Sequence, residues 1–428
     1  MGDIDDAFDS PLGLTWALIK RHKQKKALIA IEKSNIDAQG ITYYQPSNIE
    51  AFFDDNNPIS NIIISGGDEL IRLRALARTI ECAYSQGYTP IILHANNYNL
   101  ENYLVSCFGT TNISYLNGQF PFYEPFVGRA DNEICQIIMN SATQNYEVKG
   151  LGKYYIDGIT DFIRSKNIAP YLWMYITCPH MELNDKVNEA VNKGIISEDR
   201  GRRILSLIVQ GELERGNIEN FFLKLRSEAE YIIAQKNNLN KATSVTSTLK
   251  ARGAIAIDVR SASNILLINL ILSEIELLRN SGEKVYLCID NIQLTNNENL
   301  ADYIRTTGVQ SPICIISQDA YADFLGDDKL FYSTLGKSSK VILSKHVSAF
   351  SCQKYSDFIG SYDKKEISET YTGNMNIIGK FSYGTTTSKN INVKRDNRIK
   401  PERILELNDD EVFIIDNCNG EIAHTKVI

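Results

Sequence analysis

Short apolar runs recur along the chain and alternate with segments of helical periodicity. The runs occupy residues 62–64, 91–93, 254–257, 285–289, 313–316 and 341–343. Runs of this length with little polar interruption are typical of strands buried on both faces, as in a parallel sheet. The segments between them carry apolar residues at helical spacing. The sequence therefore predicts an α/β fold, with a mostly parallel sheet that is covered by helices on both faces.

A long helical stretch separates the second run from the third. Between Ile218 and Ile233, for example, apolar residues recur every three or four positions. Such an insert is too long for an ordinary crossover and too apolar for a loop. It either docks a partner or covers the core as a lid. We predict an N-terminal segment 1–57, a first core part 58–150, an all-α insert 151–245 and a second core part 246–428.

One apolar run ends in a carboxylate that has the place of a metal ligand in ATPases. The run 285–289 is followed by Asp290 and Asn291. In P-loop ATPases, an Asp at the end of a buried strand holds Mg²⁺, and the next residue, normally Glu, polarises the attacking water. Asn291 cannot accept a proton. We therefore interpret Asp290 as a vestigial Mg²⁺ ligand beside a position that has lost its catalytic base.

A second segment has the layout of a phosphate-binding loop without its motif. A strand pattern leads into Gly66 and Gly67 and then into a helical pattern. Loops of sequence G-x-x-x-x-G-K-[ST] connect a strand to a helix in this way. If Gly67 is the first glycine, Arg72 replaces the second, Leu73 replaces the Lys, and Arg74 replaces the Ser or Thr. We interpret the segment as a vestigial phosphate loop, and the alternative is an ordinary strand–helix turn.

The order of later segments carries a family resemblance. After Asp290 come Arg305-Thr306-Thr307-Gly308, a strand pattern that ends in Ser317-Gln318, and an Arg-Ile-Lys-Pro-Glu segment from Arg398. Together with Tyr123-Glu124-Pro125-Phe126, this succession resembles the TraG/TraD-like coupling proteins of type IV secretion and conjugation, in the HerA/FtsK group of P-loop ATPases. The resemblance covers roughly residues 58–428. It implies a RecA-like P-loop NTPase core with an inserted all-α subdomain.

The resemblance also implies roles for two further residues. Gln318 has the place of a sensor that orients the attacking water. Arg305 has the place of an arginine finger, which reaches into a neighbouring subunit and contributes about 10³ to 10⁵ in rate. The alternative for Arg305 is a surface arginine at a helix end. The family's all-helical domain meets cargo or processing factors, which implies a docking role for the insert.

Composition excludes several classes of protein but does not indicate a particular function. The chain has 428 residues, 43% apolar residues and a net charge of −7, so it lacks a global basic signature for nucleic acid. The eight cysteines form no C-x-x-C pair, which favours free thiols. The acidic start lacks a signal-peptide core, and no run of about eighteen apolar residues occurs. We therefore expect a cytoplasmic protein without an integral membrane segment.

The N-terminal segment contains the one basic run of the chain. Residues Ala7 to Lys20 are expected to form an amphipathic helix, and the run Lys-Arg-His-Lys-Gln-Lys-Lys begins at Lys20. Such a run contacts nucleic-acid phosphates or an anionic membrane surface, or it is the solvated end of a helix.

Two functions remain compatible with these motifs. The first is a non-catalytic pseudo-ATPase without cofactor, which scaffolds, docks DNA or a cargo protein, or completes an oligomer with an active ATPase paralogue. The second is an active DNA translocase or coupling ATPase that uses ATP and Mg²⁺, with Arg72 or Arg74 in place of the Lys. Loss of a general base costs about 10² to 10⁴ in rate. The loop Lys and Ser/Thr are also missing, so we favour the pseudo-ATPase.

Overall fold

The computed structural model describes residues 11–44, 59–146, 148–306, 311–373 and 385–426. Its centre is a ten-stranded sheet with the strand order β1-β14-β13-β10-β2-β9-β8-β3-β7-β4. The strands are β1 (Ile41–Tyr43), β2 (Asn61–Ser65), β3 (Thr89–His94), β4 (Ile113–Leu116), β7 (Ala254–Asp258), β8 (Val285–Asp290), β9 (Ile313–Ser317), β10 (Ser338–Leu343), β13 (Glu411–Asp416) and β14 (Glu421–Lys426).

The strands from β10 to β4 all pair in parallel, and β13 and β14 pair antiparallel at one side. All of the apolar runs of the sequence form strands here, which confirms the predicted α/β fold with a mostly parallel sheet. β9 lies between β2 and β8. The strand that leads to the glycine pair is therefore separated by one strand from the strand that ends at Asp290.

Helices cover both faces of the sheet because neighbouring strand residues point to opposite sides. Ile62 and Ile64 pack in the same apolar cluster as Leu76 of α2, whereas Ile63 belongs to the cluster that contains Leu267 of α11. The helices of the core are α2 (Glu69–Ser85), α3 (Tyr98–Asn112), α10 (Val245–Lys250), α11 (Ile265–Asn280), α12 (Glu298–Thr306), α13 (Ala320–Asp323), α14 (Asp328–Lys337), α15 (Ala349–Ile359) and α16 (Pro401–Leu405).

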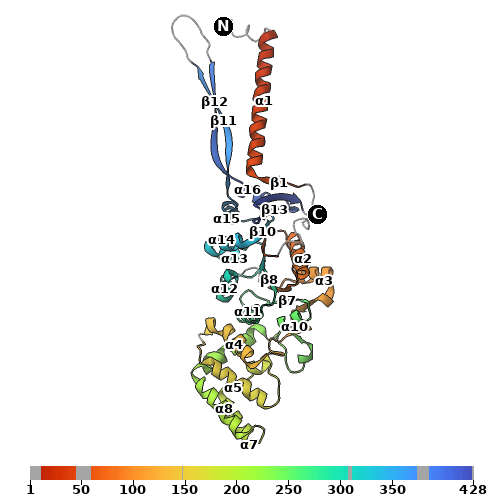
Figure 1. The fold of residues 1–428 in the computed structure, drawn as a ribbon, viewed down its shortest axis with the longest axis vertical. Helices are drawn as coiled ribbons and strands as arrows, with labels where there is room; N and C mark the ends of the chain where they lie inside the picture. Colours follow the sequence, from red (N-terminus) through yellow and green to blue (C-terminus); the bar gives the residue numbers. More distant parts are fainter. Residues whose placement is uncertain (1–10, 45–58, 147, 307–310, 374–384, 427–428) are drawn as a thin grey trace.

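A helical lobe lies at one end of the molecule (Figure 1). It consists of α4 (Asp131–Tyr146), α5 (Gly152–Ser165), α6 (Leu172–Ile176), α7 (Leu183–Asn192), α8 (Glu198–Gln210) and α9 (Arg215–Ala229). The segments that connect it to the core pair with each other as β5 (Phe122–Tyr123) and β6 (Ala242–Thr243). α4 starts before residue 151 and packs against both α5 and α11. The division into four segments stays a prediction.

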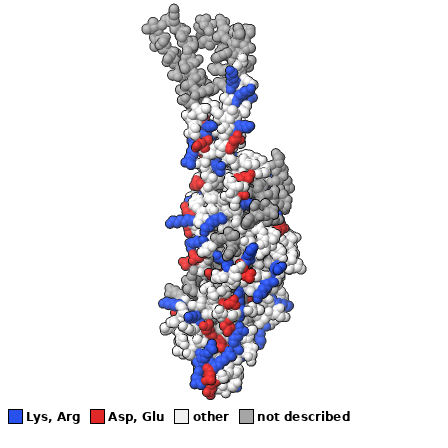
Figure 2. Space-filling view, in the orientation of Figure 1, with Lys and Arg blue, Asp and Glu red and all other residues white. Residues whose placement is uncertain are grey.

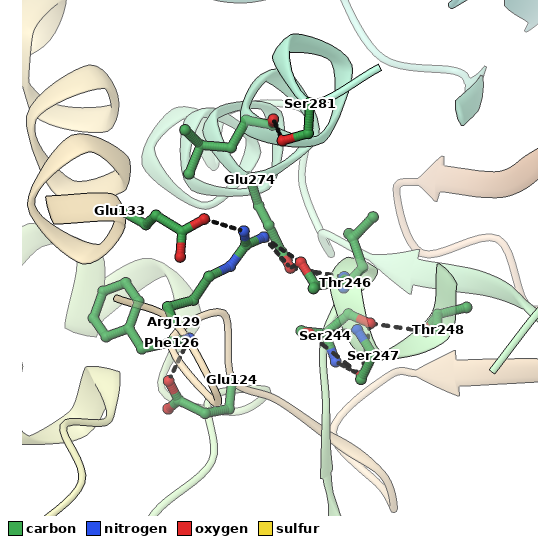
Figure 3. Close-up of polar contacts among 12 residues, drawn as sticks. Glu124, Phe126, Arg129, Glu133, Ser244, Thr246, Ser247, Thr248, Glu274 and Ser281 are labelled. Atoms are coloured by element: carbon green, nitrogen blue, oxygen red, sulfur yellow. Dashed lines mark hydrogen bonds and ion pairs between the residues drawn. The ribbon is translucent and has the colours of Figure 1, made fainter. Parts of the chain in front are cut away.

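A buried polar cluster joins the lobe to the core, and Figure 3 shows part of it. Glu274 of α11 is fully buried and accepts hydrogen bonds from Thr246 N (2.9 Å), Thr246 Oγ1 (2.6 Å) and the hydroxyl of Tyr123 (2.9 Å). Arg129 lies 3.5 Å from the same carboxylate and also donates to Thr246 Oγ1. Beside them, Glu124 accepts from Phe126 N (3.0 Å). We call Tyr123, Glu124, Arg129, Thr246 and Glu274 the joint cluster.

At the opposite end, α1 (Pro11–Gln39) and the hairpin of β11 (Ser361–Gly373) and β12 (Thr385–Asn397) form a stalk (Figure 1). The helix predicted for Ala7–Lys20 is described from Pro11 and continues to Gln39, and residues 7–10 of the prediction lie outside the described residues. The hairpin was not expected, because its sequence is mostly polar and shows no regular pattern of apolar residues. None of the described helices combines the length and the apolar character that a bilayer-spanning helix requires.

Candidate nucleotide-type site at the carboxyl edge of the sheet

Polar residues end several neighbouring parallel strands. Ser65 ends β2, Asp290 ends β8, Ser317 ends β9, His94 ends β3 and Asp258 ends β7. Each of the five is at most 2% exposed. The carboxyl ends of parallel strands lie at one edge of a sheet, and ligands of open α/β sheets bind outside this edge. The structure therefore brings the predicted glycine pair and Asp290 to the same edge.

The turn between β2 and α2 is much shorter than a phosphate-binding loop. Only Gly66, Gly67 and Asp68 separate the end of β2 from the start of α2 at Glu69. Arg72, Leu73 and Arg74 consequently lie inside the helix, and none of them is in a loop. The backbone that would wrap around phosphates is absent from this turn.

The backbone donors of this turn are used by the protein itself. Gly66 N donates to Ser317 O (3.1 Å), and Gly67 N donates to Lys345 O (2.7 Å). The Asp68 carboxylate caps α2 by accepting from Ile71 N (2.8 Å). A phosphate site at a helix N-terminus needs such N–H groups to point at the ligand. Here two carbonyl oxygens and a carboxylate already accept from these N–H groups.

Gly66 is required at this turn by both conformation and space. Its φ is +144°, and an added Cβ would lie 1.9 Å from Ser344 Oγ and 2.8 Å from the carbonyl carbon of Ser344. We expect Gly66→Ala to lower the free energy of unfolding by about 2–3 kcal/mol. Denaturant unfolding measures it. Gly87→Ala is the matched control, since Gly87 also has a positive φ but no atom lies near its Cβ position. Equal losses in both variants would contradict the steric argument.

Arg72 turns back onto the glycine turn. Its side chain is buried, and Nη1 donates to the carbonyl oxygen of Gly66. Burial lowers the pKa of Arg72, while the charges of Asp290, Glu69 and Asp68 favour its protonated form. The guanidinium thus places a fixed positive charge near Asp290, where an ATPase has a metal ion. A guanidinium has no acceptor and cannot release its proton in this setting.

The other two residues of the predicted loop take no part in the site. Leu73 is buried and packs in the apolar cluster under the sheet. Arg74 is half-buried and lies beside Tyr103 of α3. Neither side chain is among the described contacts of Asp290.

Asp290 is held by amide donors. Its side chain accepts from Asn97 Nδ2 (2.8 Å) and from Asn291 Nδ2 (3.3 Å). Burial raises the pKa of Asp290, and the bond from Asn97 together with nearby His94 and Arg72 acts in the opposite direction. Within the described ranges, no group of three or more His, Cys, Asp or Glu residues could hold a metal ion. The donor set around Asp290 does not match a Mg²⁺ site, because amides and a cation occupy the carboxylate's surroundings.

Asn291 and Gln318 lie together at the exposed rim of this edge. Asn291 has a φ of +51°, and its N–H donates to Ile316 O (3.0 Å). Its side-chain oxygen accepts from the backbone N–H of Gln318 (3.3 Å). The polar side chain of Asn291 therefore links β8 to β9, whereas the Gln318 side chain is exposed.

Arg305 lies away from this group. α12 starts after the carboxyl end of β8 and ends before the amino end of β9, so its last turn lies toward the other edge of the sheet. The Arg305 side chain is 52% exposed and pairs with Asp302 on the same helix (2.6 Å). A finger role would need a neighbouring subunit, and it stays a prediction.

Sequence reasoning missed a hydrogen-bonded group next to the glycine turn. Nδ1 of His346 lies 2.7 Å from Ser344 O, so Nδ1 carries the proton and Nε2 accepts from Ser65 Oγ (2.9 Å). Ser65 Oγ in turn accepts from the hydroxyl of Tyr355 (2.9 Å). All three side chains are buried. Only the polar strand end at Ser65 was visible in the sequence, and this group fixes the turn from the side of β10.

Two further features near the edge were also missed, a group around His94 and the carboxyl of Asp323. His94 Nε2 lies 3.3 Å from Glu101 Oε1, and its Nδ1 lies 3.9 Å from Asp258 Oδ1. Burial raises the pKa of Asp323 to about 7, and Asp319 and Asp290 act in the same direction. A carboxyl with such a pKa can exchange a proton near neutral pH. The signal for the first group was the polar residue at each strand end, and Asp323 gave none.

Comparisons with known proteins identify the fold. No protein-family model and no curated protein matches the sequence. The bacterial conjugative coupling protein TrwBdeltaN70, in an unbound form, matches with 12% identity and a TM-score of 0.53, over 89% of this chain and 90% of that chain. The plasmid coupling protein TrwB in complex with the non-hydrolysable ATP analogue ADPNP matches with 13% identity and a TM-score of 0.51, over 86% and 85%. The chain therefore has the RecA-like α/β fold of the conjugative coupling protein TrwB.

Proposed function

We propose that this protein is a pseudo-ATPase of the conjugative or type IV secretion kind, which acts as a scaffold or cargo-docking subunit without hydrolysing ATP. One observation carries the proposal: the turn that would cradle phosphates is closed by the protein's own groups. Ser317 O and Lys345 O occupy its N–H donors, and Arg72 binds its carbonyl oxygen. Binding a nucleotide here would require breaking these bonds and removing a buried arginine.

Side chains of the protein itself take the place of nucleotide and metal around Asp290, which explains how such a core stays folded without ligand. In a nucleotide-dependent core, the ligand and its metal neutralise the buried carboxylate at the strand end. Here Arg72 supplies a positive charge, and Asn97 and Asn291 supply the hydrogen bonds. The core is thereby complete in the absence of nucleotide, as a scaffold requires.

The helical lobe supports a docking role. Apolar side chains are exposed on its surface, and large exposed apolar surfaces mark interaction sites. They are Met181 (71%), Ile195 (54%), Val209 (65%), Leu213 (84%) and Leu223 (55%). We propose that cargo protein or a processing factor covers part of this surface. An oligomer that also contains an active ATPase, to which Arg305 is donated, belongs to the same proposal.

We expect no Mg²⁺–ATP affinity tighter than about 1 mM, which corresponds to roughly −4 kcal/mol. The physical reason is the loss of the phosphate cradle and of the Lys charge. Isothermal titration calorimetry with Mg²⁺–ATP measures it, with TrwB as the positive control and Asp290→Ala as the matched variant. A micromolar dissociation constant that Asp290→Ala abolishes would overturn the proposal.

A second candidate function is an ATPase with a displaced phosphate site. The observation that favours it is the Asp323 carboxyl, whose pKa of about 7 suits a general base and which interacts electrostatically with Asp290. ATP turnover that is lost in both Asp290→Ala and Asp323→Asn would establish this function. Turnover at the level of a mock preparation in the unchanged protein excludes it.

A further inference from the structure

The basic run, residues 20–26, lies on α1 in the stalk and belongs to neither the core nor the helical lobe. α1 extends away from the sheet, and its last turns are fastened to the hairpin (Figure 1). Asn35 Nδ2 donates to Lys365 O (2.9 Å), and Lys365 N donates to Asn35 Oδ1 (2.8 Å). The hairpin therefore holds one end of the helix and leaves the segment around the basic run uncovered by the described residues.

The charge of this segment contrasts with that of the whole chain. The protein has a net charge of −7, yet the seven residues from Lys20 to Lys26 contain five Lys or Arg and no acidic residue. Lys23, Lys25 and Lys26 are exposed. Figure 2 shows Lys and Arg side chains along the stalk next to the grey residues. An anionic partner would be attracted to this end of the molecule within about a Debye length.

Exposed aliphatic side chains flank the basic run. Ile19 is 55% exposed on one side of it, and Leu28 and Ile29 are 55% and 53% exposed on the other. The hairpin adds Ile391 and Val393, at 60% and 61%. Val393 pairs across the ribbon with Lys365, whose Nζ lies 3.4 Å from Ser34 Oγ of α1. These hairpin residues therefore share the face on which α1 lies.

We propose that the stalk, through α1 and this face of the hairpin, binds an anionic lipid surface. Lysines flanked by aliphatic side chains match a bilayer interface, where the charges meet lipid headgroups and the apolar groups enter the acyl boundary. A single-stranded nucleic-acid site would instead offer aromatic side chains for base stacking. The exposed side chains described on either side of the run, Ile19, Leu28 and Ile29, are aliphatic. The proposal does not depend on whether nucleotide binds.

Such binding would orient the molecule. The stalk and the helical lobe lie at opposite ends (Figure 1). A stalk on the membrane surface would therefore direct the exposed apolar side chains of the lobe away from the bilayer. The lobe would then be free to meet a partner in solution.

Flotation with vesicles tests the proposal on the full chain. Vesicles of phosphatidylcholine with added phosphatidylglycerol are compared with pure phosphatidylcholine vesicles. We expect binding to the anionic vesicles only, and a decrease on raising the salt concentration. The triple variant Lys23→Gln, Lys25→Gln, Lys26→Gln should lower the partition coefficient about a hundredfold, since each basic residue near the surface contributes about fivefold. Leu28→Ser with Ile29→Ser should lower it about tenfold.

The matched control changes the same number of exposed lysines in the helical lobe, as Lys186→Gln, Lys193→Gln and Lys224→Gln. This variant should bind as the unchanged protein does. Circular dichroism and thermal unfolding verify that each variant is folded, as expected for exposed positions. Three outcomes would overturn the proposal: no flotation with anionic vesicles, equal binding to neutral vesicles, or equal loss in the control. Binding to duplex DNA that the α1 variant loses, without vesicle binding, would instead assign the run to nucleic acid.

Discussion

Replacing Glu274 with Leu is expected to lower the free energy of unfolding by about 3–5 kcal/mol, as found when one partner of a buried charge pair is removed. The variant removes the acceptor of Thr246 N, Thr246 Oγ1 and the Tyr123 hydroxyl. It also leaves Arg129, which is 8% exposed, with only the half-buried Glu133 as its described counter-charge (3.2 Å). The joint cluster would then lose its central member.

Urea unfolding of the full chain measures this loss. Glu276→Gln is the matched control, because Glu276 is an exposed carboxylate on the same helix and should change stability by less than about 0.5 kcal/mol. In the double variant Arg129→Met with Glu274→Leu, both charges are absent, so much of the stability should return. A double variant that is less stable than Glu274→Leu would show that the charge pair is not the reason for the loss.

A second large effect is expected from pH, through Glu124. Burial raises the pKa of this carboxyl to about 8 from an ordinary value of 4.5, against the hydrogen bonds from Phe126 N and Leu172 N. Between these pH values the folded state holds a proton that the unfolded state has released. Glu124 therefore contributes its full stability below about pH 4.5 and loses it as the pH rises to about 8. The slope is about 1.4 kcal/mol per pH unit, which amounts to roughly 5 kcal/mol in total.

The comparison of Glu124→Gln with the unchanged protein isolates this contribution. A neutral amide can accept from the same backbone groups but does not titrate. Between pH 5 and pH 8, the free energy of unfolding of Glu124→Gln should fall less than that of the unchanged protein, by about 1.4 kcal/mol for each pH unit. Asp323→Asn makes the same comparison at a second site. The pKa of Asp323 is raised from 3.8 to about 7, so its contribution to stability is also lost as the pH rises, over a lower pH range. Parallel pH profiles for Glu124→Gln and the unchanged protein would show that Glu124 is ionised in the folded state.

The sequence alone determined the strands of the parallel sheet. Runs such as 62–64 and 285–289 are fully or nearly fully buried in the structure, and a strand buried on both faces needs apolar residues at every position. The buried helix α11 and the helices of the lobe followed from helical periodicity in the same way. The hairpin of β11 and β12 could not be predicted, because its residues are mostly polar and none of its described side chains is buried.

For the candidate site, the sequence by itself supported a prediction about missing groups. If Leu73, Arg74 and Asn291 stand in the places of the Lys, the Ser or Thr and the Glu, the charge, the hydroxyl and the base of a P-loop ATPase are absent. Which groups replace them was decided by the tertiary structure. The closure of the turn by Ser317 O and Lys345 O depends on the register of β2 with its two neighbours, β9 and β10. Backbone carbonyls carry no residue identity, so no sequence pattern could reveal that these two accept from the N–H groups of the glycine turn.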